Sequence, residues 1–308
     1  MAPVLVTGAS GFIGSALVAA LRASGSDVFV VDIRPFPDAS VPGVVGDLRD
    51  PGVVAAAFSS RPSAVFHLAA RTSVLQSLKD PQGVFDVNVD ITQRLLEGAR
   101  AAGTGSFVFA STNAVVGETN GVRIDEDVPL RPLTPYGATK AAAEMVCSAY
   151  ASSYDMAVCP IRFTNVYGHG MGNKDTFVIR LMRAAATTRP ALIYGDGLQE
   201  RDYLHVDDAV GAMILAQRKG VRGPLVVGTG HSTSVVDLCQ MTSDVVGAPI
   251  ETTHVDPPAG EMRAVRVDIT RARSLGYEPR FTLPVGLALT WKALRHELDQ
   301  PASSPAPR

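Results

Sequence analysis

A tyrosine and a lysine four positions apart are the residues whose types and spacing best suit chemistry. They are Tyr136 and Lys140, in the stretch Thr134-Pro135-Tyr136-Gly137-Ala138-Thr139-Lys140. Side chains four residues apart share one face of a helix. Free tyrosine, with a pKa of about 10, is a poor base at neutral pH. A neighbouring ammonium and a helix N-terminus both favour the phenolate, so the pair predicts proton transfer to and from a hydroxyl group.

The residues before this pair predict where its helix begins. Thr134 is a suitable N-cap and Pro135 a favourable first helical residue. Tyr136 would then lie in the first turn. Taken alone, the pair fits an exposed helix surface equally well, because tyrosine and lysine at this spacing are common by chance.

A glycine-rich loop lies upstream, at Thr7-Gly8-Ala9-Ser10-Gly11-Phe12-Ile13-Gly14. Glycine lets the chain turn sharply and lets phosphates approach the backbone, and the following helix offers N–H groups and a partial positive charge. Such a loop is also found in ordinary strand-to-helix turns. Followed by the tyrosine and lysine, it predicts a nicotinamide dinucleotide that moves a hydride while the tyrosine moves a proton. The expected cofactor contacts are Gly8, Gly11, Phe12, Ile13, Gly14, Tyr136 and Lys140.

Asp32 ends the second expected strand, 18 residues after Gly14. A carboxylate there can accept hydrogen bonds from the adenosine ribose hydroxyls and repels a 2′-phosphate. This residue therefore favours NAD over NADP, although it also fits a solvated carboxylate at a strand end. Arg34 is a second cofactor candidate, because an arginine nearby could serve a phosphate.

Short apolar runs alternate with helical patterns through the first half of the chain, which predicts an α/β fold with a doubly wound parallel sheet. The expected buried strands are Val4–Val6, Val28–Ile33, Ala64–His67, Phe107–Ala110 and Ala157–Ile161. After about residue 166 the pattern loosens, with a helix expected at Thr176–Ala186 and strands at Ala191–Tyr194 and Leu225–Val227.

These patterns predict a Rossmann domain at residues 1–166, joined by about 205–230, and a smaller, discontinuous C-terminal α/β substrate lobe at 167–204 and 231–299. Residues 300–308 are rich in Pro, Ser and Ala, which predicts a disordered tail.

Composition excludes several classes of function. The 308 residues carry 28 basic and 30 acidic side chains, and no basic patch predicts binding to nucleic acid or to a membrane. No apolar run reaches membrane-spanning length, and the first strand leaves no room for a signal peptide. Three cysteines, Cys147, Cys159 and Cys239, lie far apart with no metal-type spacing, which predicts free thiols and a cytoplasmic location.

The chain resembles the extended short-chain dehydrogenase/reductases, and within them the nucleotide-sugar epimerases and dehydratases, from about Pro3 to His296. The motifs appear in the expected order: Gly46-Asp47-Leu48-Arg49-Asp50, His67-Leu68-Ala69-Ala70, Asn88-Val89 and Ala110-Ser111-Thr112. The resemblance implies cofactor contacts from Asp47, Leu48, Leu68, Ala69, Ala70 and the structural Asn88. It also implies that Thr112 is the third catalytic residue, although Thr112 could be only a strand-end hydroxyl.

The resemblance also implies a substrate site for a nucleotide sugar. Asn165, in the segment Arg162–Gly168, would approach the sugar diphosphate, and Arg201 would bind it through charge-assisted hydrogen bonds. Tyr194 would pack near the nucleotide base. In other interpretations Asn165 is a turn residue, Arg201 a surface ion-pair partner and His67 structural. The expected substrate contacts are Thr72, Thr112, Asn113, Asn165, Tyr194, Arg201 and Arg263.

Departures from the family pattern narrow the reaction. Asn113 and Ala114 follow Thr112 where dehydratases and decarboxylases carry an acid, and neither can act as a general acid or base. The absent acid argues against elimination and decarboxylation as the reaction. It favours epimerisation at C4, which needs only Tyr136 and the cofactor. Pro258 stands where many members have a diphosphate-binding arginine. Either Arg263 or Arg266 substitutes for that arginine, or the diphosphate is bound more weakly.

The identity of the sugar stays open. Asn165 favours a neutral hexose, because the uronate epimerases usually have threonine there. Arg71, Thr72 or Lys174 could instead bind a carboxylate, and Val265 leaves room for an N-acetyl group.

We therefore expect an NAD-dependent 4-epimerase that inverts C4 of a UDP-hexose through a 4-keto intermediate. The alternatives are a UDP-glucuronate 4-epimerase, a dehydratase, decarboxylase or reductase of the same family, and a non-catalytic NAD-binding protein. The resemblance also implies a homodimer that uses helices near residues 81–101 and 135–153.

Overall fold

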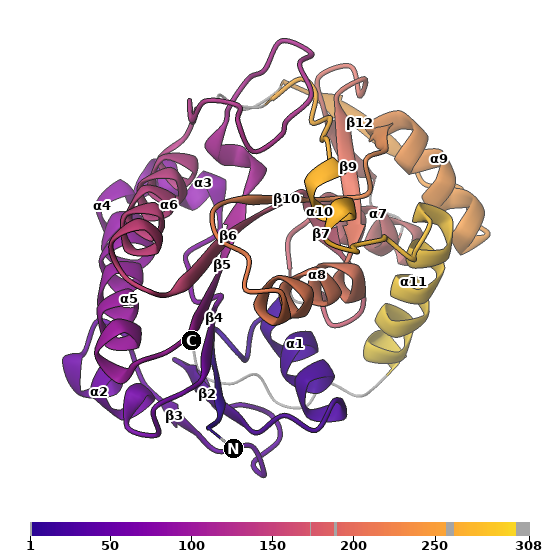
Figure 1. Cartoon of the computed structure of the whole chain (residues 1–308). Coiled ribbons are helices and arrows are strands. Elements are labelled where there is room, and N and C mark those ends of the chain that lie inside the picture. Colours follow the sequence, from indigo (N-terminus) through magenta and orange to yellow (C-terminus); the bar gives the residue numbers. More distant parts are fainter. Residues whose placement is uncertain (1, 173, 188–189, 257–261, 300–308) are drawn as a thin grey trace.

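The computed structural model describes residues 2–172, 174–187, 190–256 and 262–299. These residues form a seven-stranded parallel sheet in the order β10-β6-β5-β4-β1-β2-β3 (Figure 1). From β1 the chain moves to one edge and then returns towards the other, which confirms the doubly wound sheet. The strands are β1 (Val4–Thr7), β2 (Val28–Asp32), β3 (Gly43–Val45), β4 (Ala64–His67), β5 (Ser106–Thr112), β6 (Ala157–Phe163) and β10 (Leu225–Val227).

Helices cover both faces of this sheet (Figure 1). One core cluster joins it to α1 (Phe12–Ala23) and α8 (Val206–Arg218). The other joins it to α2 (Pro51–Phe58), α5 (Ile91–Ala102) and α6 (Pro135–Ser153). Because side chains alternate along a strand, Val6 enters the first cluster and Leu5 the second. Continuous apolar strands such as β4 are therefore buried on both faces.

The helix that carries the tyrosine and lysine begins as predicted. Thr134 is its N-cap, and the Thr134 hydroxyl oxygen accepts a hydrogen bond from the backbone N–H of Gly137 at 3.2 Å. Pro135 occupies the first helical position. This cap fixes the first turn of α6, which contains Tyr136.

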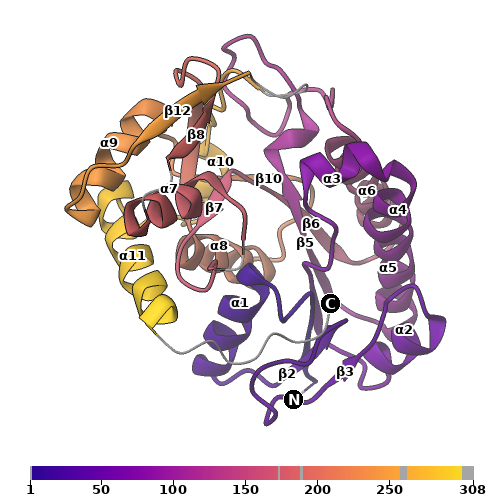
Figure 2. The same ribbon diagram turned by 180° about the vertical axis from the view of Figure 1, so that it is seen from behind.

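The remaining elements form the second region of the chain. In Figure 2 they lie beyond α1, on the side away from α5 and α6. One sheet has the order β11-β9-β7, and β12 pairs with β8. The strands of these two sheets are β7 (Asn165–Tyr167), β8 (Ala191–Tyr194), β9 (Glu200–His205), β11 (Ser232–Ser234) and β12 (Thr252–Val255). The helices of this region are α7 (Phe177–Ala186), α9 (Val235–Val246) and α11 (Leu283–Asp299). The short helix α10 (Thr270–Ser274) packs instead against β10, in the core of the large sheet.

Three short helical elements connect β4 to α5, and one follows β5. The first three are α3 (Val74–Lys79), α4 (Pro81–Phe85) and a π-helical turn at Asp86–Asp90, and the last is a 3₁₀ turn at Asn113–Val115. The predicted strand at Leu225–Val227 is confirmed as β10, which pairs with β6 and joins the large sheet. The expected tail at residues 300–308 and Pro258 both lie outside the described residues.

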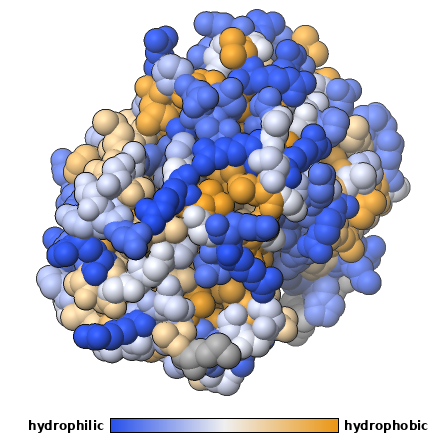
Figure 3. Space-filling model, in the orientation of Figure 1, coloured by the Kyte–Doolittle hydropathy of each residue, from blue (hydrophilic) through white to orange (hydrophobic). Residues whose placement is uncertain are grey.

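Membrane-spanning helices, clusters of metal ligands and the state of the cysteines can be examined in the residues that the structure describes. No helix there is both long enough and apolar enough to cross a bilayer. The same residues hold no cluster of three or more candidate metal ligands. Cys147 and Cys159 are buried free thiols, and Cys239 is a half-buried one. The face in Figure 3 mixes hydrophilic residues with smaller hydrophobic patches.

Candidate active site

A cavity of about 820 Å³ lies where the carboxyl ends of β1, β2, β4 and β5 meet the region that begins at β7. This volume is near the upper end of the roughly 300–1,000 Å³ range of small-molecule sites. Ligands of doubly wound sheets bind where consecutive strands begin to be added on the opposite side of the first strand. In this sheet that point lies between β1 and β4. The cavity is lined by these predicted site residues: Gly8, Gly11, Phe12, Ile13, Gly14, Asp32, Arg34, Asp47, Leu48, Leu68, Ala69, Ala70, Thr72, Thr112, Tyr136, Lys140 and Asn165.

Two glycines of the glycine-rich loop have no room for a side chain. Gly8 has a φ of +70°, and a Cβ there would lie 2.6 Å from the backbone nitrogen of Ala69. A Cβ on Gly14 would lie 2.1 Å from the carbonyl oxygen of Gly8.

The helix that follows this loop starts without a competing anion. Gly11 is the N-cap of α1, with no side-chain cap and no acidic residue in the first turn. The first N–H groups of a helix have no intrahelical acceptor. The loop therefore fits the diphosphate of a dinucleotide, which these N–H groups would bind.

Asp32 lies at the edge of the same cavity. Its carboxylate accepts hydrogen bonds from the backbone N–H groups of Ser10 and Arg34, both at 3.0 Å. The Arg34 guanidinium donates in turn to the carbonyl oxygen of Ser10 at 2.8 Å. These contacts fix the carboxylate beside the glycine-rich loop, where it fits the hydroxyls of an adenosine ribose.

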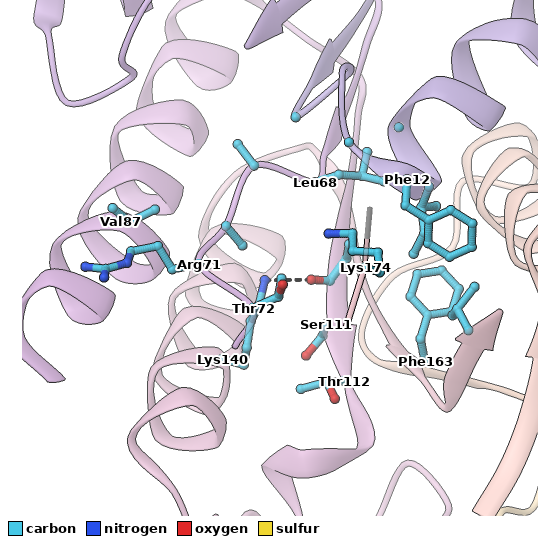
Figure 4. A pocket seen from close by; sticks show the side chains of 18 of the residues that line it. Phe12, Leu68, Arg71, Thr72, Val87, Ser111, Thr112, Lys140, Phe163 and Lys174 are labelled. Carbon is cyan, nitrogen blue, oxygen red and sulfur yellow. Dashed lines mark hydrogen bonds between the residues drawn. The ribbon is translucent and has the colours of Figure 1, made fainter. Parts of the chain in front are cut away.

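Thr112, Tyr136 and Lys140 converge on the cavity from β5 and α6. The Lys140 ammonium donates a hydrogen bond to the carbonyl oxygen of Ala110 at 2.8 Å, drawn as a dashed line in Figure 4. It also lies 4.4 Å from the centre of the Phe109 ring. Strand β5 thus supplies both the threonine and the groups that position the lysine.

Burial decides the protonation of Tyr136 in the protein alone. Burial raises the pKa of the Tyr136 phenol to about 12, and hydrogen bonding with Thr112 opposes this rise. Burial lowers the pKa of the Lys140 ammonium to about 7, against the attraction of Cys147 and Glu144. In the protein alone the phenol is therefore less acidic than free tyrosine, because desolvation disfavours its charged form.

A buried ion pair behind these residues was not anticipated from the sequence. The Glu144 carboxylate accepts a hydrogen bond from the Ser111 hydroxyl at 2.5 Å and pairs with the Arg162 guanidinium at 3.0 Å. Both charged side chains are about 95% buried. The pair joins β5, β6 and α6 directly behind Thr112 and Lys140. Its only sequence signal is that Glu144 continues the four-residue spacing of Tyr136 and Lys140.

Two predicted contacts are buried beside the cavity and do not line it. The Asn88 side chain accepts from the backbone N–H of Arg71 at 2.9 Å and donates to the Thr139 hydroxyl at 3.1 Å. It therefore ties the segment after β4 to α6. Asn113 is buried in the 3₁₀ turn after β5.

Three predicted substrate contacts lie farther along the second region. Tyr194 ends β8 with its ring 5.8 Å from the guanidinium carbon of Arg180. The backbone N–H of Arg263 donates to the Glu118 carboxylate at 2.9 Å. This hydrogen bond, and more weakly the charge of Arg201, lowers the pKa of Glu118. Arg201 and Arg263 thus lie around one carboxylate and outside the residues that line the cavity.

His67 is structural, as the sequence interpretation allowed. Its ring nitrogens are hydrogen-bonded with Thr7 at 2.8 Å and Thr92 at 3.0 Å. Burial lowers the pKa of His67 to about 3, so the imidazole stays neutral and braces β1 against β4 and α5. Val265 is also buried, in the main core cluster.

Comparison with known proteins agrees with this geometry. The model of the NAD dependent epimerase/dehydratase family matches residues 4–228. A UDP-glucose 4-epimerase of Mycolicibacterium smegmatis is 36% identical over 311 residues, which cover 95% of this chain and 98% of the relative. A dTDP-glucose 4,6-dehydratase of Streptomyces griseus is 34% identical over 93% of this chain and 92% of its own.

Solved structures show the same likeness. MoeE5 in complex with UDP-glucose and NAD is 39% identical with a TM-score of 0.91, over 96% of this chain and 100% of its own. MoeE5 is also known in complex with UDP-glucuronic acid and NAD, with a TM-score of 0.90. The UDP-glucose 4-epimerase of Thermus thermophilus, in complex with NAD, is 33% identical with a TM-score of 0.90, over 95% of this chain and 99% of its own. The chain therefore belongs to the NAD dependent epimerase/dehydratase family.

Proposed function

We propose that the protein is an NAD-dependent UDP-hexose 4-epimerase that inverts C4 of UDP-glucose. The observation that carries this proposal is the meeting of Thr112, Tyr136 and Lys140 with the glycine-rich loop in one cavity. Likeness to UDP-glucose 4-epimerases over nearly the whole chain supports the same reaction.

Each catalytic side chain has a defined part in this reaction. NAD, when bound, would supply a hydride acceptor for C4 of the sugar and a hydride donor for the same carbon. Tyr136 accepts the proton of the C4 hydroxyl and gives it back, and Thr112 holds the reacting oxygen through its hydroxyl. Lys140 would bind the nicotinamide ribose, with its ammonium positioned by the hydrogen bond to the carbonyl oxygen of Ala110. Returning the hydride to the opposite face of the 4-keto sugar inverts C4 and consumes nothing.

The lining of the cavity supports the following binding assignments. The glycine-rich loop and Asp32 would hold the diphosphate and adenosine ribose of NAD, and Asp47 and Leu48 the adenine. Asn165 and Thr72 would contact the substrate. We also propose that the lobes divide as the sequence suggests, with residues 1–166 and about 205–230 binding NAD. Residues 167–204 and 231–299 would then bind the sugar nucleotide.

A UDP-glucuronate 4-epimerase is the second candidate. It is favoured by the complex of MoeE5 with UDP-glucuronic acid and by Arg71 and Lys174, two cations that line the cavity. The Arg71 guanidinium already pairs with the Asp80 carboxylate at 2.5 Å, which weakens this candidate.

The first experiment separates these activities. The purified protein is incubated with UDP-glucose, UDP-galactose, UDP-N-acetylglucosamine and UDP-glucuronate, and the products are resolved by chromatography while NADH absorbance is followed. Interconversion of UDP-glucose and UDP-galactose without net NADH is expected. Conversion of UDP-glucuronate alone would establish the second candidate. Net NADH would indicate a dehydrogenase or reductase, and no turnover of any sugar would favour a non-catalytic NAD-binding protein.

The second experiment removes the proposed base. Tyr136→Phe should lower kcat by about 10²–10⁴-fold, the usual contribution of a positioned proton-transfer group, while the NAD content stays the same. Tyr154→Phe is the matched control, because Tyr154 is exposed at the end of α6. Full activity of Tyr136→Phe would refute the proposed mechanism.

We further propose a cytoplasmic homodimer that associates through α5 and α6. Free thiols at Cys147, Cys159 and Cys239 support a reducing compartment. Exposed apolar side chains near α6 support an apolar subunit interface; they are Leu75, Leu78, Phe85 and Met145. Sedimentation of wild type and Met145→Glu tests the dimer, since a charge in this face should shift the protein towards the monomer.

A further inference from the structure

Two cations from distant parts of the chain line the same cavity. Arg34 follows β2 in the large sheet, and Lys174 lies between β7 and α7. Figure 4 shows the Lys174 side chain in the same space as Phe12 and Leu68, within the cavity. Partial burial lowers the pKa of the Lys174 ammonium, and the nearby charge of Arg34 lowers it further. Arg34 therefore lies within electrostatic reach of Lys174.

The acidic side chains around these two cations are already engaged. Asp175, the neighbour of Lys174, pairs with Arg180 at 3.4 Å. The Asp32 carboxylate accepts hydrogen bonds from the backbone N–H groups of Ser10 and Arg34, and it also pairs with the Arg34 guanidinium at 3.9 Å. Lys174 is therefore the one of these two cations that needs a counter-charge. Among the described residues, no carboxylate lies within ion-pair distance of the Lys174 ammonium. Two like charges in a partly desolvated space are unfavourable unless an anion lies near them.

The backbone around Lys174 is anchored next to the glycine-rich loop. The backbone N–H of Lys174 donates to the carbonyl oxygen of Met171 at 2.8 Å. Met171 is buried in the core cluster of the second region, and Phe12, the first residue of α1, packs against that same cluster. Lys174 therefore approaches the N-terminus of α1 from the opposite lobe, where the diphosphate of a dinucleotide fits.

We propose that Lys174 binds the diphosphate of NAD from the second lobe, opposite the N-terminus of α1, and so retains the cofactor between the two hydride transfers. This inference rests on the proposed function. An epimerase must hold its cofactor in both redox states, because release after the first transfer would strand the 4-keto sugar. An ammonium on the diphosphate is suited to that task, since the diphosphate keeps its charge when the nicotinamide is reduced.

The sugar nucleotide also contains a diphosphate, so the same chemistry could serve the substrate. The neighbours of Lys174 favour the cofactor. Arg34 lies beside Asp32, at the adenosine end of the cavity, and Phe12 lies in the first turn of α1. Both belong to the part of the site that binds the dinucleotide.

Calorimetry with NAD-free protein tests this assignment with four ligands: NAD⁺, ADP-ribose, adenosine and UDP. Lys174→Met should weaken NAD⁺ and ADP-ribose about tenfold or more, as expected for a lost charge-assisted hydrogen bond. Adenosine and UDP should stay within about twofold of wild type, within the error of such measurements. Lys174→Arg should restore most of the loss. Lys219→Met, at the exposed end of α8, is the matched control and should bind every ligand as wild type does.

Three results would overturn the inference. The first is unchanged affinity of Lys174→Met for NAD⁺ and ADP-ribose. The second is a loss of affinity confined to UDP, which would assign Lys174 to the substrate. The third is an equal loss for adenosine, which has no phosphate and would reveal a general disturbance of the site. These experiments measure binding and need no turnover. If the protein fails to epimerise any of the UDP-sugars, the role of Lys174 in binding NAD can still be tested.

Discussion

The Lys140 ammonium and the carbonyl oxygen of Ala110 are 2.8 Å apart, which joins α6 to β5 two residues before Thr112. The strand end that carries the threonine therefore also positions the lysine. Lys140 is 98% buried, and an ammonium in such a place is held by hydrogen bonding and by the face of the Phe109 ring. This arrangement gives the first prediction, which concerns stability.

Lys140 should make the folded protein more stable as pH rises from about 7 to 9. Its folded pKa of about 7 lies below the ordinary value of 10.5. Between these values the unfolded chain binds more protons than the folded one, so raising the pH stabilises the fold. The contribution should approach roughly 1 kcal/mol per pH unit. Urea unfolding of the NAD-free protein should show a free energy of unfolding that rises with pH in wild type and not in Lys140→Met.

The pH window matters, because buried cysteines oppose the effect at higher pH. Burial raises the pKa of the Cys147 thiol above its ordinary value of 9.0, so Cys147 destabilises the fold as pH rises beyond 9. Lys219→Met serves again as the control. Identical pH dependence in wild type and Lys140→Met would contradict the prediction.

The hydroxyl of Thr112 should shift the pH–rate profile through Tyr136. Hydrogen bonding with Thr112 lowers the pKa of the Tyr136 phenol, so Thr112→Val should move the rise of kcat to higher pH and lower the rate at pH 7. A loss of about 10–100-fold at pH 7 is expected from one hydrogen bond to a group that becomes charged. Thr112→Ser should keep most of the wild-type profile. A uniform loss with an unshifted profile would instead assign Thr112 to substrate binding alone.

The buried Glu144–Arg162 pair should be costly to break and cheaper to replace. Glu144→Gln leaves the Arg162 guanidinium, itself only 4% exposed, without its counter-charge. Removing one partner of a buried pair costs about 3–5 kcal/mol. The double variant Glu144→Gln with Arg162→Met should recover part of that loss in urea unfolding. If the double variant is no more stable than Glu144→Gln, the uncompensated charge of Arg162 is not the source of the loss.

Much of the fold follows from local sequence, because its strands are short apolar runs buried on both faces. The strand at Ala64–His67 and the cap at Thr134 have the predicted bounds. β3 was missed, because Gly43–Val45 is a three-residue edge strand with little apolar pattern. β9 was also missed, because Glu200–His205 lacks the apolar character of the other strands.

The site was harder to predict where it depends on packing between distant segments. Motif spacing placed Thr112, Tyr136 and Lys140 on one cavity, but it did not give the direction of the Tyr136 pKa, which burial decides. The Glu144–Arg162 pair was missed because it joins residues 18 apart on different elements. Arg201 and Arg263 remain predictions as substrate contacts, since they lie around Glu118.

Asp32 should decide which dinucleotide binds. Asp32→Asn keeps the shape of the side chain and removes its charge, so the repulsion of a 2′-phosphate is lost while Arg34 stays nearby, 63% exposed. The dissociation constant should rise about tenfold for NAD⁺ and fall about tenfold for NADP⁺, each the size of one charge-assisted interaction. Asp38→Asn is the control, because Asp38 pairs with Arg22 on the surface and carries the same charge. Displacement of bound, fluorescent NADH by NAD⁺ and by NADP⁺ measures both constants. Tighter binding of NADP⁺ than of NAD⁺ by the wild-type protein would show that Arg34 outweighs Asp32 at the adenosine ribose.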